Sequence, residues 1–141
     1  EIVPAIEQAR DESNIYLSFT SLTNMVAGGR LSKTQGIIGN LLNIKVGAGV
    51  THTDGTVDVL LKGRGMKTIA KFNNNVIAKM QEYKEMVAIG ISHAGIPEEA
   101  TQLADRLKAI WPDLEIPVLN TTPIISTHTG VGALAILYRA R

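Results

Sequence analysis

Residues 44–62 of the chain, IKVGAGVTHTDGTVDVLLK, carry the strongest short hairpin signal in the sequence. The dipeptide Asp54-Gly55 separates two segments, 44–53 and 56–62, and such a pair favours the tight turns that join antiparallel strands. In the second segment apolar side chains recur at every other position from Val57 to Leu61, which gives the strand one apolar face. The stretch therefore predicts a two-stranded antiparallel ribbon in the middle of the chain.

Helical and strand patterns flank this ribbon on both sides. Apolar residues at helical spacing predict helices at 4–11, 22–27, 32–42, 66–83 and 96–110. Short apolar runs predict strands at 15–19, 86–92, 116–119 and 133–138, and the continuous run 86–92 is typical of a strand buried on both faces. Together these elements predict one α+β (α/β mixed) domain over residues 1–141, with about six strands in a mixed sheet packed with about four helices.

The composition allows a folded core and excludes several classes of function. With 141 residues, 45% of them hydrophobic and 19% charged, the chain has the size and content of one globular domain. The net charge is only +1 and aromatic residues make up 4%, so neither a basic stripe nor a stacking platform for nucleic acid is expected. The chain has no cysteine, which excludes disulfides and thiolate chemistry.

The cellular location is indicated only indirectly. The absence of cysteine fits a reducing compartment, so a cytoplasmic location is expected. No apolar run approaches the roughly 18 residues that would span a bilayer. Residues 1–7 lack the basic and apolar regions of a signal peptide. Since the chain also lacks an initiator methionine, we expect it to be part of a longer protein or a processed product.

Two glycine-containing runs are the candidates for ligand binding. The first, Ser126-Thr127-His128-Thr129-Gly130-Val131-Gly132-Ala133, combines hydroxyls, an imidazole and two glycines. A turn with positive φ at glycine could present backbone N–H groups to a carboxylate or phosphate, and Thr127, His128 and Thr129 add donors beside it. A plain glycine-rich turn between two strands fits the same residues.

The second run is Gly28-Gly29-Arg30-Leu31-Ser32. Gly28 and Gly29 end one predicted helix and Ser32 can cap the next, which would place Arg30 close to a helix N-terminus. Backbone N–H groups and the helix dipole favour an anion there, and a guanidinium offers a flat, bidentate fork for a carboxylate or phosphate. A solvent-exposed arginine at the start of a helix is the alternative.

The remaining polar motifs have structural explanations. We expect His93, at a strand end, to be buried with its hydrogen bonds satisfied and His52, in the hairpin, to face solvent. The three histidines have no HxH or HxxxH spacing, so no metal and no other cofactor is expected. The sequence contains no G-x-S-x-G elbow, Walker sequence or GxGxxG motif. A small hydrolase or transferase with His128 as general base is the enzymatic alternative.

Several short motifs follow one another over nearly the whole chain. They are residues 22–30, Leu31-Ser32-Lys33, residues 38–45, Asp54-Gly55, Arg64-Gly65 and Thr127-His128-Thr129-Gly130. Their order and spacing resemble the DegV family of bacterial fatty-acid-binding proteins. The resemblance covers only the C-terminal domain of a two-domain protein with the EDD fold, and it implies that the N-terminal domain is absent from this chain.

The resemblance implies a carrier and not a catalyst. In the family a long-chain fatty acid lies between the two domains, with its tail in an apolar tunnel and its carboxylate at the mouth. Several members present the bound acid to a separate fatty acid kinase. By motif match Arg30 and His128 would hold the carboxylate, and the neighbouring site residues would be Gly28, Gly29, Ser32, Thr127, Thr129 and Gly130. The implied partners are thus a fatty acid, a kinase subunit and the protein's own N-terminal domain.

The chain departs from the family pattern at two positions. Val46 and Val131 stand where the family usually has proline, so the loops near the site can differ in geometry. Apolar residues that follow Arg30 on the same predicted helix could form a wall for the acyl tail, although ordinary core packing explains them equally well. These residues are Ile37, Ile38, Leu41 and Leu42.

Overall fold

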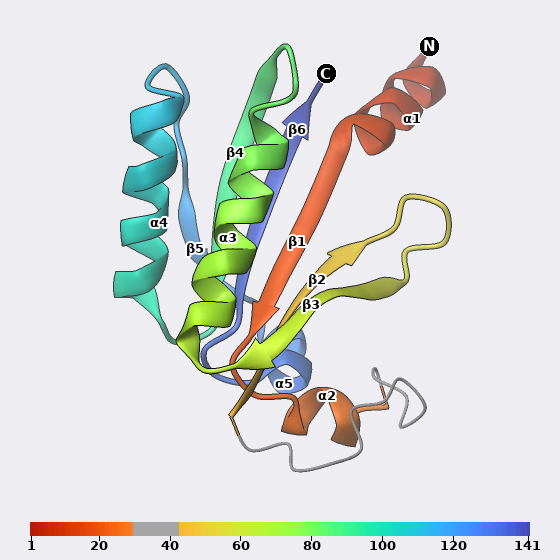
Figure 1. Ribbon diagram of the computed structural model, residues 1–141. Helices are drawn as coiled ribbons and strands as arrows, with labels where there is room; N and C mark the ends of the chain where they lie inside the picture. Colours follow the sequence, from red (N-terminus) through yellow and green to blue (C-terminus); the bar gives the residue numbers. More distant parts are fainter. Residues whose placement is uncertain (30–42) are drawn as a thin grey trace.

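Six strands form one sheet in the order β3-β2-β1-β6-β4-β5 in the computed structural model of the chain, which describes residues 1–29 and 43–141 (Figure 1). The strands are β1 (Ser13–Phe19), β2 (Ile44–Val50), β3 (Val57–Arg64), β4 (Met86–His93), β5 (Val118–Asn120) and β6 (Leu134–Ala140). Neighbouring strands run antiparallel except β4 and β5, which run parallel. The mixed sheet that the sequence predicts is confirmed.

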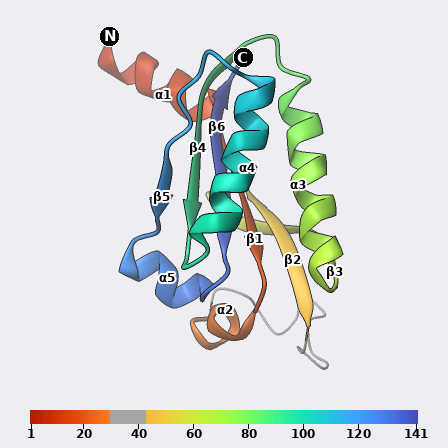
Figure 2. The same ribbon diagram turned by 90° about the vertical axis from the view of Figure 1, so that its left-hand side faces the viewer.

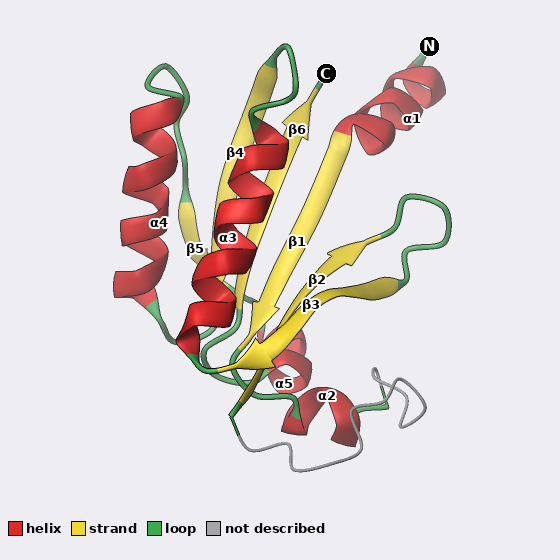
Figure 3. Cartoon of the chain, viewed as in Figure 1, coloured by secondary structure: helices red, strands yellow, loops and turns green. Residues whose placement is uncertain are grey.

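Five helices accompany the sheet in the described part of the chain (Figure 3). They are α1 (Ile2–Glu12), α2 (Thr23–Ala27), α3 (Met66–Met80), α4 (Pro97–Ile110) and α5 (Pro123–Thr129). Four of the predicted helices correspond to α1–α4, whereas the one expected at 32–42 lies outside the described residues. Among the described helices, none combines the length and the apolar character needed to cross a membrane.

The two long helices α3 and α4 lie on the same face of the sheet (Figures 1 and 2). The inner side of α3 is apolar at helical spacing, and its buried residues are Phe72, Val76, Ile77 and Met80. These side chains share one core cluster with alternate residues of the central strands, among them Ile89, Ile91 and Ile136. Most of the hydrophobic core therefore lies between this face of the sheet and the two helices.

The opposite face of the sheet carries apolar side chains that α3 and α4 do not cover. Because successive residues of a strand point to opposite faces, Ile15 and Leu137 lie away from the core cluster, and each is 36% exposed. Gly90 and Ser92 of β4 are only half-buried on this face, so the expectation that β4 is buried on both faces is wrong. Figure 2 shows α1 and α5 toward the two ends of this open face, on the side away from α3.

A second, smaller core cluster closes one end of the open face. Phe19 at the end of β1, together with Leu22 and Met25 around α2, is buried against Val46 and Ala48 of β2. The short helix α2 is therefore fixed by burial of its apolar side chains, since five residues alone make too short a helix to be stable in water.

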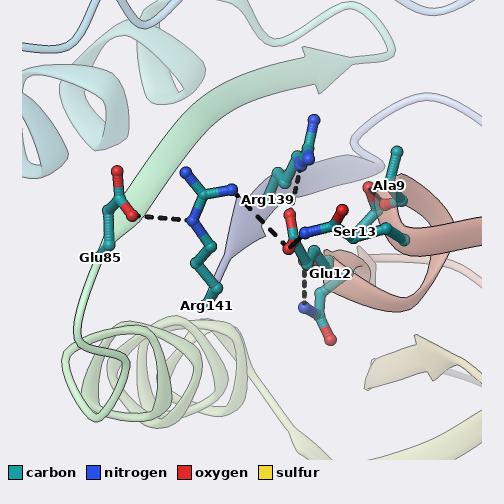
Figure 4. Close-up of polar contacts among 8 residues, drawn as sticks. Ala9, Glu12, Ser13, Glu85, Arg139 and Arg141 are labelled. Atoms are coloured by element: carbon teal, nitrogen blue, oxygen red, sulfur yellow. Dashed lines mark hydrogen bonds and ion pairs between the residues drawn. The ribbon is translucent and has the colours of Figure 1, made fainter. Parts of the chain in front are cut away.

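The last turn of α1 is tied to the sheet by ion pairs (Figure 4). Glu12 Oε2 lies 2.7 Å from Arg139 Nε, and Glu12 Oε1 lies 3.8 Å from a terminal nitrogen of Arg141. Arg141 also contacts Glu85 at 2.8 Å. The hydrogen bond from Arg139 is the main reason why the pKa of Glu12 lies below its ordinary value. This network joins α1 to β6 and to the residue before β4.

The hairpin expected at Asp54-Gly55 is confirmed, and its loop is held by a carboxylate. Asp54 Oδ1 accepts hydrogen bonds from Thr51 Oγ1 at 2.5 Å, from Thr56 Oγ1 at 2.8 Å and from the Thr56 backbone N–H at 3.0 Å. These bonds, the one from Thr51 most strongly, lower the pKa of Asp54 to about 2. His52, in the same loop, is exposed as expected.

Close approach of α3 to the sheet depends on a glycine in β2. A Cβ atom placed on Gly47 would collide with the ring of Phe72. Gly90 provides a contrast, because a Cβ atom there would meet only Pro117, with Cγ at 3.9 Å. A methyl group is therefore expected to destabilise the fold at Gly47 but not at Gly90.

We predict that Gly47→Ala lowers the free energy of unfolding by about 1–3 kcal/mol, because the methyl group overpacks the contact with Phe72. Gly90→Ala is the matched control, with a strand glycine in open space, and it should leave the stability nearly unchanged. Urea denaturation of the three proteins measures both effects. Equal losses in the two variants would show that Phe72 does not set the spacing.

We also predict that the stability of the hairpin loop depends on pH. Because folding lowers the pKa of Asp54 from 3.8 to about 2, the ionised carboxylate stabilises the folded loop above about pH 4, and this stabilisation is lost as the pH falls toward 2. Carbon-detected NMR titration of the Asp54 carboxyl should give a midpoint near 2. Asp54→Asn keeps one acceptor oxygen but does not titrate, so loop amide shifts in that variant should lose this transition. An ordinary midpoint for Asp54 would refute the hydrogen-bonded loop.

Candidate functional site

The glycine-rich run at residue 126 begins as the end of a helix, α5, and the turn expected in the run is confined to residues 130–132, where Gly130 and Gly132 have φ of 74° and 93°. Pro123 occupies the first turn of α5, and the Thr122 hydroxyl accepts the N–H of Ile125 at 3.4 Å as an N-cap. Gly130, with φ 74°, ends the helix, and its N–H donates to the Ser126 carbonyl at 2.9 Å. The signals at both ends are visible in the sequence, but seven residues are too few to show a helical period.

This geometry removes the backbone anion site that the sequence suggested. The N–H of Gly130 is used within α5, and the N–H of Gly132 donates to the Ala94 carbonyl at 2.8 Å. The end of a helix presents carbonyl groups and the negative end of its dipole, which favour a cation. Among the groups that the structure describes here, the side chains of α5, His128 among them, are therefore the candidates for recognition of an anion.

The structure brings together the described ends of the two glycine-containing runs. A Cβ atom placed on Gly28 would lie 2.5 Å from Nδ1 of His128 and 3.1 Å from its Cε1. A Cβ atom placed on Gly130 would likewise lie close to α2, at 3.4 Å from Nδ2 of Asn24. Residues separated by about a hundred positions in the sequence thus form one contact between α2 and α5, at the lower end of the molecule in Figure 1.

The imidazole of His128 has an unusual environment in this contact. Its Nδ1 is buried and has no hydrogen-bond partner among the residues that the structure describes. Close packing against Gly28 holds the ring, because glycine leaves room for the imidazole beside the backbone. His93 differs, since it is buried and its Nδ1 accepts the N–H of Ile96 at 3.2 Å, as the sequence predicts.

The two threonines of the run have different surroundings. Thr127 is exposed, and its hydroxyl donates to the Pro123 carbonyl at 2.8 Å, which leaves the oxygen free to accept. Thr129 is buried on the side of α5 that faces the sheet. Gly29 lies exposed at the end of α2 with φ 70°. The other predicted site residues lie outside the described part of the chain, namely Arg30, Ser32, Ile37, Ile38, Leu41 and Leu42.

Two adjoining hollows occupy the open face of the sheet. The first, which we call the hairpin hollow, measures about 670 Å³ and extends from His128 and Gly29 to the hairpin residues Val50 and Val57. The second, the sheet-edge hollow, measures about 470 Å³ and lies over β4, β5 and β6. The two share lining residues in the middle of the face, namely Ile15, Leu17, Ile125 and Thr129.

Sequence reasoning missed the residues that line these hollows. Ile15, Leu17 and Ile125 form a continuous apolar surface, yet each reads as ordinary core in the sequence. One signal was available, because β1 is apolar at successive positions and such a strand has to be covered on both faces. Within the described residues there is no group of three or more His, Asp or Glu side chains that could hold a metal ion.

Comparison with known proteins agrees with this arrangement. A family model described as "Uncharacterised protein, DegV family COG1307" matches residues 1–141. The chain belongs to the DegV family. A DegV domain-containing protein of Streptococcus pyogenes serotype M3 is 35% identical over 139 residues, which are 99% of this chain and 48% of that protein. A DegV domain-containing protein of Streptococcus pneumoniae serotype 4 is 36% identical over 138 residues, which are 98% of this chain and 48% of that protein. The DegV chain thus spans about half the length of these relatives.

Solved structures of DegV proteins have the same fold. The fatty acid binding DegV family protein SAG1342 of Streptococcus agalactiae superposes with a TM-score of 0.82 at 30% identity, covering 99% of this chain and 49% of that one. The fatty acid kinase B3 protein of Streptococcus pneumoniae, loaded with linoleic acid, gives a TM-score of 0.82 at 25% identity with the same coverage. DegV of Bacillus subtilis, a fatty acid binding protein, gives a TM-score of 0.78 at 26% identity, covering 99% of this chain and 49% of that one.

We predict that Gly28→Ala destabilises the DegV chain by about 1–3 kcal/mol, because the methyl group would press on the His128 ring. The same substitution in a His128→Ala background removes the collision partner and should cost much less. Thermal unfolding of the parent, the two single variants and the double variant gives a double-mutant cycle that measures this effect. Additive losses would mean that Gly28 and His128 do not pack against each other.

Proposed function

We propose that this chain is the fatty-acid-binding C-terminal half of a DegV carrier, with the acyl tail on the open face and the carboxylate beside His128. The observation that carries the proposal is the hairpin hollow, an apolar space that ends at His128 and Gly29. Arg30, the proposed partner of the carboxylate, directly follows Gly29 in the sequence.

The physical chemistry of the hollow supports a lipid with a charged head. Transfer of an acyl chain from water to apolar walls contributes roughly 0.8 kcal/mol for each buried CH₂. A carboxylate at such walls has to be paired, and Arg30 with a hydrogen bond donated by His128 would do so. Ser32 and Thr127 complete the side-chain set proposed for the head group, with the Thr127 hydroxyl donating to the carboxylate in place of its bond to the Pro123 carbonyl. Gly28, Gly29, Thr129 and Gly130 would form the backbone around it.

The open face also supports a role for a second domain. Ile15, Leu137 and Ile125 are at least one third exposed, and Leu119 is 63% exposed. An apolar surface of this kind usually marks an interaction site. Because the relatives are about twice as long, the N-terminal half of the protein is the proposed cover, and it would bury the acyl tail from the other side.

The carrier role includes a proposed partner and no catalysis by this chain. The similar B3 protein is named for fatty acid kinase, so we propose that the bound acid is presented to a kinase subunit that carries out the chemistry. A hydrolase or transferase with His128 as general base is the alternative, and in it the buried Nδ1, packed on Gly28, would leave Nε2 to take the proton.

We predict that a fatty acid co-purifies with the full-length protein and that Arg30→Ala weakens its binding by about 1.5–3 kcal/mol, the usual value for a charge-assisted hydrogen bond. His128→Ala should cost about 0.5–1.5 kcal/mol if the imidazole donates while neutral. Mass spectrometry of an organic extract identifies the lipid, and calorimetry with the delipidated protein measures the losses. Arg106→Ala, which removes an exposed charge from α4 on the far face, should bind like the parent.

One result would reject the carrier, and another would reject its head-group site. One is an extract without lipid together with turnover of a generic ester or phosphate that disappears in His128→Ala, which supports the hydrolase. The other is unchanged affinity at low salt in both Arg30→Ala and His128→Ala, which removes the proposed head-group site.

A further inference from the structure

We propose that Val57, at the hairpin end of the hairpin hollow, limits the length of the acyl chain that the protein accepts. This inference rests on the proposed function, since it assigns the tail to one of the two hollows. Of these, only the hairpin hollow has His128 and Gly29 in its lining, so a carboxylate held there directs the tail toward Val50 and Val57.

The direction of the hollow follows from the strands beneath it. Ile15, Leu17 and Phe19 of β1 all line the hairpin hollow, and at about 3.3 Å per residue they extend over about 13 Å. Phe19 lies at the end near α2, and the pairing of Tyr16 with Gly49 places Ile15 level with Val50. The hairpin tip lies far from α2 and α5 (Figure 1), so α5, which contains His128, and the start of β3 at Val57 lie at opposite ends of the hollow.

Val57 has the properties of a fixed end wall. It pairs directly with Val50 across the two strands, so both side chains lie on the same face of the ribbon. Valine is branched at Cβ and has restricted χ1 freedom, so these side chains cannot swing aside as a leucine or methionine would. Val57 also packs against the second core cluster, which extends from α2 along β2 to Ala48, and this contact fixes its position.

The loop beyond Val57 strengthens this wall. Thr51 and Thr56 are joined by a backbone bond of 2.9 Å, and the carboxylate of Asp54 accepts bonds from both residues. Thr56 and Gly55 line the same end of the hollow. A loop held by several hydrogen bonds resists widening, so a longer chain would meet a stiff boundary.

The test is the chain-length profile of the full-length protein and its Val57 variants. Each delipidated protein is incubated with an equimolar mixture of straight-chain acids from dodecanoic to eicosanoic acid, and the bound fraction is measured by mass spectrometry. Val57→Phe should move the maximum by about two carbons toward shorter acids, since each displaced CH₂ lowers affinity about fourfold. Val57→Ala should move it toward longer acids, and this variant remains informative if the larger one does not fold.

Two further variants make the result specific. Val87→Phe introduces the same ring at a half-buried strand valine that lines neither hollow, and it should leave the profile unchanged. Gly90→Val fills the sheet-edge hollow. A shift with Gly90→Val and none with either Val57 variant would place the tail in the other hollow and overturn the inference.

The outcomes also separate this inference from the proposed function. A parent protein that binds acids, with Val57→Phe and Val57→Ala profiles identical to its own, refutes the role of Val57 and leaves the carrier intact. A parent that binds none of the acids refutes the carrier and the inference together.

Discussion

The arrangement of the domain depends on a sheet that is apolar on both faces but packed against long helices on only one. Tyr16 and Ile136 point into the core beneath α3 and α4, whereas Ile15 and Leu137, one position away, point to the open face. Leaving such a surface in water is unfavourable, so it requires a cover. Both hollows, and with them the proposed lipid site, are consequences of this unequal coverage.

The contact between α2 and α5 determines what chemistry is available at the end of that surface. α5 directs its C-terminal end toward α2, and Gly28 allows the His128 ring to pack directly on the chain. Since the N–H groups of Gly130 and Gly132 are used inside the fold, they are not free to bind a carboxylate. The proposed site therefore relies on side chains, with His128 in the last turn of α5 as its central described residue.

Half of the binding surface is proposed to come from elsewhere in the longer protein. A site shared between two domains can close on a lipid that neither domain would enclose alone, because apolar contacts on both sides of an acyl chain remove more of it from water. The hairpin is well suited to this arrangement, since its own hydrogen bonds fix its shape without help from a second domain.

The sequence by itself determined the local elements, the antiparallel hairpin and the family. Alternation from Val57 to Leu61, the Asp54-Gly55 turn and the apolar spacing in α3 are local patterns, and local hydrogen bonding and burial are sufficient to produce them. The tertiary structure alone decided that residues 126–129 are helical, that His128 lies on Gly28, and that one face of the sheet remains open. These features depend on contacts between residues far apart in the chain, and no periodicity within a short segment encodes such contacts.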